Sequence, residues 1–301
     1  MKDAILPPPG VYVVAVSGGI DSRALLHLLS EHNKTHAKWQ LTVAHLDHGM
    51  RPDSNADRQF VEKLAKNEGL EFVYKRINLG ASTNEARARK ERYTFLHDVR
   101  NKINARSIIT AHHQDDVLET AIINMLRGSG RRGLSSLSSR PDVLRPLLLV
   151  SKGQILTYAK ANQLTWREDS TNQDDHYLRN YVRIHILPRF SEADRRQLLN
   201  IVTRVGVLNL ALDDLLRQGI KKHGKSKTIM RSWFNNLPHA VAKETLATWL
   251  RDQHITDFDK KIIERLVVHA KAGRPGQLFP VKDRYYLKIE KGFLALAQAE
   301  R

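Results

Sequence analysis

The fold is decided by the stretch Val11-Tyr12-Val13-Val14-Ala15-Val16-Ser17-Gly18-Gly19-Ile20-Asp21-Ser22. Its first half is a continuous, mostly β-branched run, typical of a strand buried on both faces of a parallel sheet. A helical pattern follows, roughly from Asp21 to His32. The two glycines let the backbone turn sharply, and the helix N-terminus after them favours anions. We interpret the turn as a phosphate-binding loop; the alternative is an ordinary capped turn.

The alternation of strand and helix continues through the first half of the chain. Apolar runs predict further strands at residues 41–46, 71–77 and 107–111. Helical spacing of apolar residues predicts helices at residues 57–68, 85–103 and 114–126. Four strand–helix units in series predict an α/β fold with a doubly wound parallel sheet, which binds ligands at the carboxyl ends of its strands.

The pattern changes after about residue 190. A long helical pattern begins at Glu192 and continues to about Leu216, and the polar stretch from Lys221 to Lys227 is typical of a linker. Two more helical patterns and three short strand patterns follow, at residues 239–251, 258–271, 277–281, 285–289 and 293–297. We therefore predict a catalytic domain at residues 1–190, a helical linker at 191–224 and a small α+β domain at 225–301.

The composition limits the classes of partner and chemistry. The 301 residues include 49 Lys and Arg against 32 Asp and Glu, a net charge of +17, and no cysteine. The positive excess predicts a polyanion, nucleic acid before an anionic membrane surface, although solubility alone is a third interpretation. Without cysteine, this sequence forms no disulfide, thiolate zinc site, iron–sulfur cluster or thiol nucleophile.

The sequence contains no targeting signal and no apolar run approaching the ~20 residues of a membrane span. We expect a soluble cytoplasmic protein with no membrane partner. No protein partner is evident, and a homodimer stays open. A formal Walker A match, Gly219-Ile220-Lys221-Lys222-His223-Gly224-Lys225-Ser226, follows a helix instead of a buried strand, so we do not interpret it as a nucleotide site.

Acidic and histidine side chains follow the second and fourth predicted strands, at His45-Leu46-Asp47-His48 and at His112-His113-Gln114-Asp115-Asp116. Glu119 lies three and four residues after the two aspartates and so shares their helix face. As a set beside two histidines at the carboxyl end of a strand, these acids favour a substrate-binding role. Helix capping is the alternative for any one of them. A dinuclear metal site is another, but it leaves the glycine loop without a use.

Ser17-Gly18-Gly19-Ile20-Asp21-Ser22 resembles the pyrophosphate loop of the N-type ATP pyrophosphatases, the PP-loop superfamily. Further motifs resemble bacterial tRNA(Ile)-lysidine synthetases, in the same order, over about residues 10 to 190. The C-terminal third matches only loosely, and Val117 stands where that family commonly has Gln. The motifs are His45–Arg51, Arg89–Tyr93, Ala111–Thr120, Arg127–Leu134, Leu144–Leu147, Glu168–Asn172 and Leu178–Arg183.

The resemblance implies an ATP-dependent ligase that forms a C–N bond. Such an enzyme joins L-lysine to C2 of the first anticodon cytidine of tRNA(Ile) with a CAU anticodon. The reaction passes through an adenylated tRNA, releases AMP and pyrophosphate, and changes the specificity of codon and amino acid from Met to Ile.

The candidate site residues follow from the motifs and the resemblance together. The catalytic candidates are Asp21, Asp47, Asp115, Asp116 and Glu119, of which the last four would also bind lysine. The candidates for ATP binding are Ser17, Gly18, Gly19, Ile20, Asp21, Ser22, His45, His48, Arg92 and His112. Asp21 and Asp47 are the candidates for Mg²⁺.

Three basic clusters predict a surface that follows tRNA phosphates, although a solvated face is the alternative. The first two would hold the anticodon loop, and the C-terminal domain would hold tRNA further away. The candidates are Arg127, Arg131, Arg132, Arg179, Asn180, Arg183, Lys221, Lys222, Lys225 and Lys227.

Other functions with a similar loop stay open. A tRNA 2-thiocytidine synthetase or another PP-loop thiolase would carry sulfur through cysteines, which this chain lacks. An NAD or GMP synthetase would not need a charge of +17. An RNA-binding module without enzymatic activity would not explain an ATP loop with facing carboxylates.

Overall fold

A computed structural model of the chain describes residues 1–36, 39–49, 54–78, 85–167, 178–225, 227–256 and 258–299. It divides into two compact units, Met1–Gly206 and Val207–Arg301. The end of one motif named above, Met50–Arg51, and the whole of another, Glu168–Asn172, lie outside the described residues, as does Ser226. The predicted boundaries at residues 190 and 224 stay predictions.

The first unit contains a five-stranded parallel sheet with the order β3-β2-β1-β4-β5. The central strand pairs with β2 on one side and with β4 on the other, so the strand order reverses beside it. In such sheets the ligand crevice lies at the carboxyl ends of the strands where the order reverses. The predicted doubly wound α/β fold is confirmed. The strands are β1 (Gly10–Ala15), β2 (Trp39–Asp47), β3 (Glu71–Arg76), β4 (Ser107–Ile109) and β5 (Val143–Leu144).

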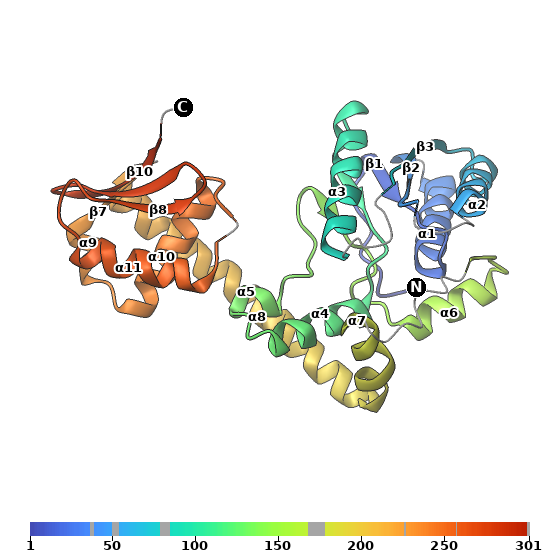
Figure 1. Cartoon of the computed structure of the whole chain (residues 1–301). Helices are drawn as coiled ribbons and strands as arrows, with labels where there is room; N and C mark the ends of the chain where they lie inside the picture. The colour runs from blue at the N-terminus through green and yellow to red at the C-terminus, as the bar shows by residue number, and fades with distance from the viewer. Residues whose placement is uncertain are drawn as a thin grey trace. The chain divides into compact units, whose positions relative to one another are not determined.

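Helices cover both faces of this sheet (Figure 1). One face packs against α1 (Ile20–His36), α2 (Ser54–Asn67) and α6 (Lys152–Ala161), and the other packs against α3 (Glu85–Lys102). Because neighbouring strand residues point to opposite faces, Val14 lies in the first core and Val13 in the second. This burial on both faces explains the uninterrupted apolar run of β1.

A third core lies under α4 (Gln114–Leu126). It includes residues of the π-helical turn and the 3-10 turn that follow α7, and of the first part of α8. Val117 is buried in this core, with 6% of its surface exposed, so its side chain does not face the polar site. The turns are α7 (Leu178–Tyr181), a π-helical turn (Val182–Ile186) and a 3-10 turn (Leu187–Arg189), and α8 spans Glu192–Lys222.

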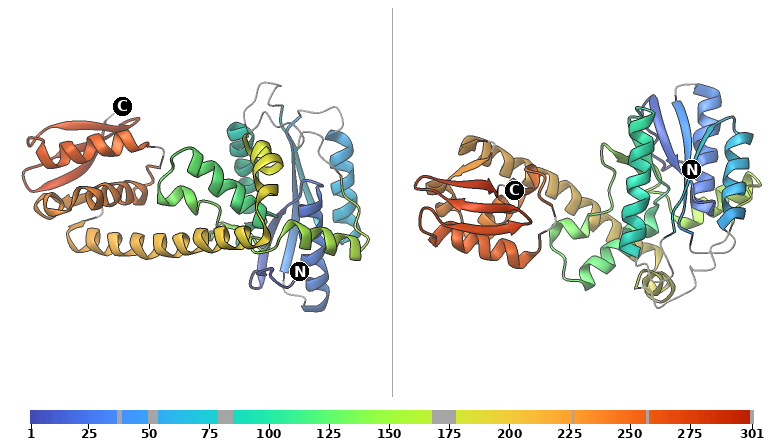
Figure 2. Two further views of the ribbon diagram at one scale, coloured as in Figure 1. Left: turned by 90° about the horizontal axis from the view of Figure 1, so that it is seen from below. Right: turned by 45° about the horizontal axis from the view of Figure 1, so that its top comes forward.

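The second unit is a small α+β domain, as predicted. An antiparallel sheet with the order β6-β7-β10-β9-β8 packs against three helices around a core that includes Trp249 and Phe234 (Figure 2). The strands are β6 (Gly224–Lys225), β7 (Thr228–Met230), β8 (Leu278–Lys282), β9 (Tyr285–Ile289) and β10 (Phe293–Gln298). The helices are α9 (Arg231–Asn236), α10 (His239–Asp252) and α11 (Lys260–Ala272).

The expectation of a linker at Lys221–Lys227 is wrong. Helix α8 continues to Lys222, and β6 pairs with β7 in an antiparallel hairpin. Gly224 permits this pairing, since a Cβ there would clash with the backbone oxygen of Thr228. The formal Walker A match therefore begins inside a helix and continues into an edge strand, without the strand–loop–helix context of a nucleotide site. No helix in the described parts of the chain is long and apolar enough to cross a membrane.

Candidate active site

The glycine loop lies at the carboxyl end of β1, at the predicted place. Gly18 has φ +93°, in the left-handed region that favours glycine. The hydroxyl of Ser22 donates to the Gly19 carbonyl oxygen at 2.9 Å and lies 3.1 Å from the Ser17 hydroxyl. Ser22 is buried and Ser17 exposed, so Ser22 closes the loop while Ser17 stays open to a ligand.

The carboxylate of Asp21 connects three helices. Asp21 lies in the first turn of α1, and its Oδ1 accepts from Nζ of Lys152 at 2.5 Å. Its Oδ2 lies 3.7 Å from Nε2 of His113. Lys152 is the first residue of α6, and His113 is the N-cap of α4. Neither Lys152 nor a role for His113 was predicted from the sequence.

The chain after α6 returns to the glycine loop. The backbone N–H of Arg167 donates to the Gly18 carbonyl oxygen at 3.0 Å, and its guanidinium pairs with Asp57 of α2. The loop is therefore held at its own backbone by a segment far away in the sequence.

Two candidates at the end of β2 are buried and make internal hydrogen bonds. His45 lies with Nδ1 2.8 Å from the carbonyl oxygen of Val16, and burial lowers its pKa. Asp47 accepts through Oδ1 from the N–H of Gly49 at 2.7 Å and through Oδ2 from the Tyr74 hydroxyl at 3.1 Å. These contacts give both side chains a role in fixing the end of β2, and their proposed ligand contacts stay predictions.

Two further histidines lie near arginines. Nε2 of His48 is 3.3 Å from Nη2 of Arg92 on α3. Nδ1 of His112 is 2.8 Å from the Thr110 hydroxyl. Burial lowers the pKa of His112 to about 3, against the opposing charge of Asp116. His112 is therefore neutral at physiological pH and can accept or donate a hydrogen bond without carrying charge.

The two aspartates at the start of α4 have different partners. Oδ2 of Asp116 accepts from the backbone N–H of His113 at 2.9 Å, and the two residues form a capping box. Burial acts to raise the pKa of Asp116, but the nearby His113, His112 and Arg183 lower it overall. Asp115 pairs with Arg195 of α8 at 3.1 Å. The capping alternative thus holds for Asp116, which still faces the charged groups described next.

Glu119 is completely buried and holds a cation. Its Oε1 accepts from Nε of Arg183 at 2.7 Å, and its Oε2 accepts from Nη2 of the same side chain at 3.0 Å. Nε of Arg179 lies 3.7 Å from Oε2, and Nη2 of Arg183 lies 3.8 Å from Oδ1 of Asp116. Burial raises the pKa of Glu119, and the hydrogen bonds from Arg183 oppose that shift. Asp116 and Glu119 of the predicted acidic group therefore bind guanidinium groups of the chain itself, and we call these four side chains the cation site.

Two of the candidates for tRNA binding, Arg179 and Arg183, belong to this cation site. Arg179 and Arg183 direct their guanidinium groups to Glu119, and Arg183 lies on the π-helical turn. Single π-helical turns are frequent at functional sites. The predicted tRNA contacts of Arg179, Asn180 and Arg183 are not tested by these contacts and stay predictions.

The other basic candidates lie on the surfaces of the two units. Arg127 is exposed after α4, beside Leu126 with 63% of its surface exposed. Arg131 and Arg132 begin the short helix α5 (Arg131–Leu134). The side chain of Asn124 on α4 fixes this helix by donating to the Gly133 carbonyl oxygen at 2.7 Å. In the second unit, the exposed candidates are Lys221, Lys222, Lys225 and Lys227.

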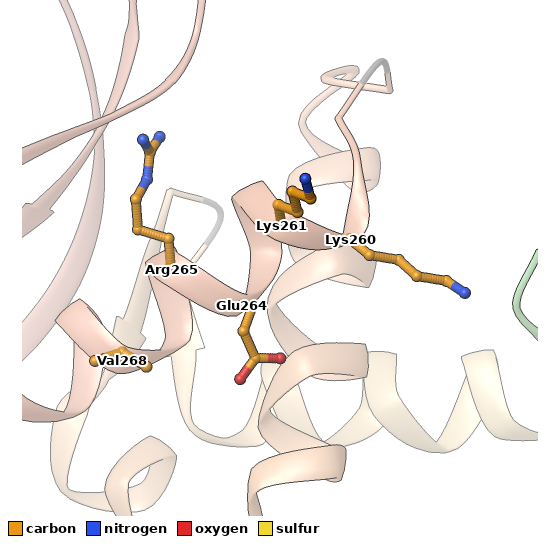
Figure 3. A pocket seen from close by; sticks show the side chains of 5 residues that line it. All are labelled: Lys260, Lys261, Glu264, Arg265 and Val268. Carbon is orange, nitrogen blue, oxygen red and sulfur yellow. The ribbon is translucent and has the colours of Figure 1, made fainter.

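One basic surface was not predicted. An open depression of about 460 Å³ lies along α11 in the second unit. Lys261 and Arg265 project to one side of the helix and Glu264 to the other (Figure 3). Glu264 pairs with Lys243 at 2.8 Å and His239 at 2.5 Å, so other side chains balance its charge. Because basic and acidic residues alternate along this helix, the sequence alone did not indicate a basic surface.

A magnesium ion would have to bind with few protein ligands. Among the described residues, no group of three or more acidic or histidine side chains could hold a metal. Mg²⁺ that binds nucleotide phosphates needs only one or two carboxylates. Asp21 fits this requirement because its carboxylate is partly exposed beside the loop, whereas both oxygens of Asp47 accept protein hydrogen bonds.

Comparison with known proteins gives relatives for most of the chain. One relative is the tRNA(Ile)-lysidine synthase of Thermus thermophilus, 40% identical over 194 residues, which are 62% of this chain and 37% of the relative. Another is the tRNA(Ile)-lysidine synthase of Actinobacillus pleuropneumoniae, 32% identical over 254 residues, which are 79% of this chain and 58% of the relative. The chain thus spans less than two thirds of the length of either relative.

The fold is also found in a solved structure. The U34-tRNA thiolase NcsA from Methanococcus maripaludis, with its 4Fe–4S cluster, superposes with a TM-score of 0.56 at 16% identity, covering 65% of this chain and 71% of that chain. At this identity the likeness concerns the fold alone. The family model of the PP-loop domain matches residues 7–190, more than half of the chain. The chain therefore belongs to the PP-loop domain family.

Proposed function

We propose that this protein is an ATP-dependent ligase that joins L-lysine to C2 of the first anticodon cytidine of tRNA(Ile) with a CAU anticodon. Membership of the PP-loop domain family and relatives named tRNA(Ile)-lysidine synthase support this proposal. In the proposed reaction ATP adenylates the O2 atom of the cytidine and releases pyrophosphate. The lysine amine then replaces AMP at C2, which yields lysidine and changes the specificity from Met to Ile.

The observation that carries the proposal is the cation site, which a series of side-chain contacts connects to the phosphate loop. Asp21 of the loop lies 3.7 Å from His113, which lies 3.6 Å from Asp116. Asp116 and Glu119 together hold the guanidinium of Arg183. A protonated amine substrate carries the same charge as this guanidinium, and the cation site would place it close to a nucleotide on the loop.

The cation site also suits the attack of an amine on carbon. A lysine amine has an ordinary pKa of about 10.4 and must lose a proton before it attacks carbon. We propose that Glu119 binds the ammonium group, with Asp115, Asp116 and Asp47 as further candidates for lysine contacts. Glu119 is also the proposed acceptor of the proton, because burial raises the pKa of its carboxyl. The C–N bond then forms as the C–O bond to AMP breaks, and the electron pair of that bond leaves with AMP.

The glycine loop can accommodate phosphates at its backbone. Among the described residues, a Cβ placed on Gly19 would have one neighbour within 4 Å, Oγ of Ser17 at 3.6 Å. The space beside the Cα of Gly19 is therefore open to a ligand. We propose that Asp21 holds Mg²⁺ at these phosphates. The proposed contacts to the nucleoside are the side chains of His45, His48 and His112, which lie at or just after the ends of β2 and β4, and of Arg92 on α3, beside His48.

We propose that tRNA binds along exposed basic side chains of both units. The net charge of +17 favours this, because contacts to phosphates release counterions and dominate nucleic-acid affinity. The target cytidine would leave its stack to enter the site, as chemistry on a base requires. The proposed place of reaction is the cytoplasm, and a homodimer remains one of our hypotheses. Thiolation is not favoured, since the chain has no cysteine to carry sulfur or a cluster.

The test is incubation of the full chain with Mg²⁺, ATP, labelled L-lysine and a tRNA(Ile) transcript bearing CAU. We expect ATP-dependent label on this tRNA and none on a methionine tRNA with the same anticodon. Asp21→Ala should abolish adenylation, and Glu119→Ala should raise KM for lysine more than KM for ATP. The exposed Asp214→Asn, in the second unit, is the matched control. ATP consumption without label on tRNA would contradict the proposal.

A further inference from the structure

The phosphate loop has no cation of its own. Residues 17–22 contain neither Lys nor Arg, although nucleotide phosphates are commonly bound by a lysine beside the loop. Lys152 comes from α6, 131 positions after Asp21 in the sequence, and its ammonium lies at the loop. We propose that Lys152 is the phosphate-binding cation of this loop. This inference rests on the part of the proposed function that concerns ATP.

The ion pair between Lys152 and Asp21 is placed where a ligand can open it. Nζ of Lys152 lies 2.5 Å from Oδ1 of Asp21, and the two side chains are 35% and 30% exposed. Ion pairs between such partly exposed side chains contribute little to stability. The fold therefore does not depend on this pair, and the ammonium is free to move to phosphate oxygens nearby.

The backbone of Lys152, in contrast, is held firmly beside the loop. Ser151 caps α6, with its N–H donating to Oε1 of Gln154 at 2.8 Å and its hydroxyl accepting from the N–H of Gln154 at 3.3 Å. The carbonyl oxygen of Val150 accepts from the N–H of Gln114 at 3.0 Å, which ties this turn to the start of α4. Only the flexible side chain of Lys152 has to turn when a nucleotide binds.

The helix itself is packed against α1. Ile155 is completely buried in the core that contains Leu25 and Leu29 of α1. The hydroxyl of Tyr158 lies 2.9 Å from Nδ1 of His27, also on α1. Because Asp21 begins α1 and Lys152 begins α6, this packing fixes the separation of the two N-termini. Two helix N-termini and one ammonium thus face the same place, an arrangement that favours a polyanion.

This position suits the step that releases pyrophosphate. In adenylation a bond forms between cytidine O2 and the α-phosphorus, and the bond from that phosphorus to the bridging oxygen breaks. The electron pair of the broken bond leaves with pyrophosphate, and no proton is transferred. A compact ammonium at the β- and γ-phosphates would neutralise the charge that gathers there. Lys152 would therefore contact the part of ATP that AMP lacks.

The test compares the binding of ATP and AMP, with Mg²⁺ and without tRNA or lysine. The variants are Lys152→Met, Lys152→Arg and, as the matched control, Lys160→Met on the exposed side of the same helix. Loss of a charged hydrogen bond should weaken ATP about 10- to 100-fold in Lys152→Met. AMP affinity should stay unchanged, Lys152→Arg should keep most of the ATP affinity, and Lys160→Met should match the wild type.

Three results would overturn the inference. Equal losses for ATP and AMP would mean that Lys152 only supports the structure. Unchanged affinity for ATP would mean that the ammonium does not reach the phosphates. Absence of ATP binding in the wild type would remove the ligand altogether. Selective ATP loss in Lys152→Met, together with a wild type that transfers no lysine, would support Lys152 and contradict the proposed ligase.

Discussion

The ion pair between Glu119 and Arg183 allows a quantitative test of the cation site. Glu119 is completely buried, whereas the side chain of Arg183 is 38% exposed. Arg183→Met removes both hydrogen bonds to the carboxylate and leaves a buried charge. We therefore expect a large loss of stability from this change and a smaller loss from Glu119→Gln, after which the guanidinium can still reach water.

The magnitudes follow from the contacts. Removing one partner of a buried pair typically costs 3–5 kcal/mol, and Arg179 at 3.7 Å retains some attraction, so we expect about 3 kcal/mol for Arg183→Met. Glu119→Gln should cost about 1–2 kcal/mol. The double variant contains no stranded charge and should also cost about 1–2 kcal/mol, which corresponds to a coupling of about 3 kcal/mol.

The assay is urea unfolding of the first unit, monitored separately from the second because two units need not unfold together. Arg217→Met is the control, since the pair of Arg217 with Asp252 is exposed and lies in the second unit. Free L-lysine should stabilise Arg183→Met more than the wild type, because its ammonium would replace the missing guanidinium. Additive losses in the double variant, or no effect of lysine on Arg183→Met, would refute this reasoning.

Three further predictions concern other parts of the chain. The pKa of His112 falls from 6.5 to about 3 on folding, so the neutral imidazole stabilises the fold above the unfolded value, and this stability is lost as the pH falls. Between about pH 7 and about pH 5, the free energy of unfolding should fall by about 2 kcal/mol more in the wild type than in His112→Asn. Equal losses in the two proteins would contradict this. Replacing Lys221 and Lys222 by Gln should reduce the salt dependence of tRNA binding by about 1 in slope per lost phosphate contact, and an unchanged slope would remove these lysines from the interface. A Cβ on Gly133 would clash with Cβ of Ser129, so Gly133→Ala should lower the free energy of unfolding by about 1–3 kcal/mol in thermal unfolding. Adding Ser129→Gly should restore this stability in the double variant.

Features of the fold that depend on neighbouring residues could be predicted from the sequence. The apolar run of β1 and the glycines after it are local signals, and together they indicate a parallel sheet with a phosphate loop at its edge. The acids after β4 are also local, and the structure places them at the predicted edge. Helical spacing alone places Glu119 on the same face of α4 as Asp115.

Contacts between distant segments could not be predicted. Arg183 meets Glu119 across 64 positions, and its basic character alone favoured a surface that binds tRNA. Lys152 meets Asp21 across 131 positions, in a region where short apolar runs obscure the start of α6. The polar residues from Lys221 to Lys225 resemble a linker in composition, because an edge hairpin needs few apolar side chains. For the same reason, the sequence did not indicate that a backbone N–H and a tyrosine hydroxyl would donate to the two carboxylate oxygens of Asp47.

The most direct measurement is nucleoside analysis by mass spectrometry of tRNA(Ile) bearing CAU, after reaction with the full chain, ATP and isotope-labelled lysine. We predict that the first anticodon cytidine is converted to lysidine containing the label, with one AMP formed for each lysine fixed. We expect no product with Asp21→Ala. An unmodified cytidine, or a modified one without the label, would contradict the proposed function.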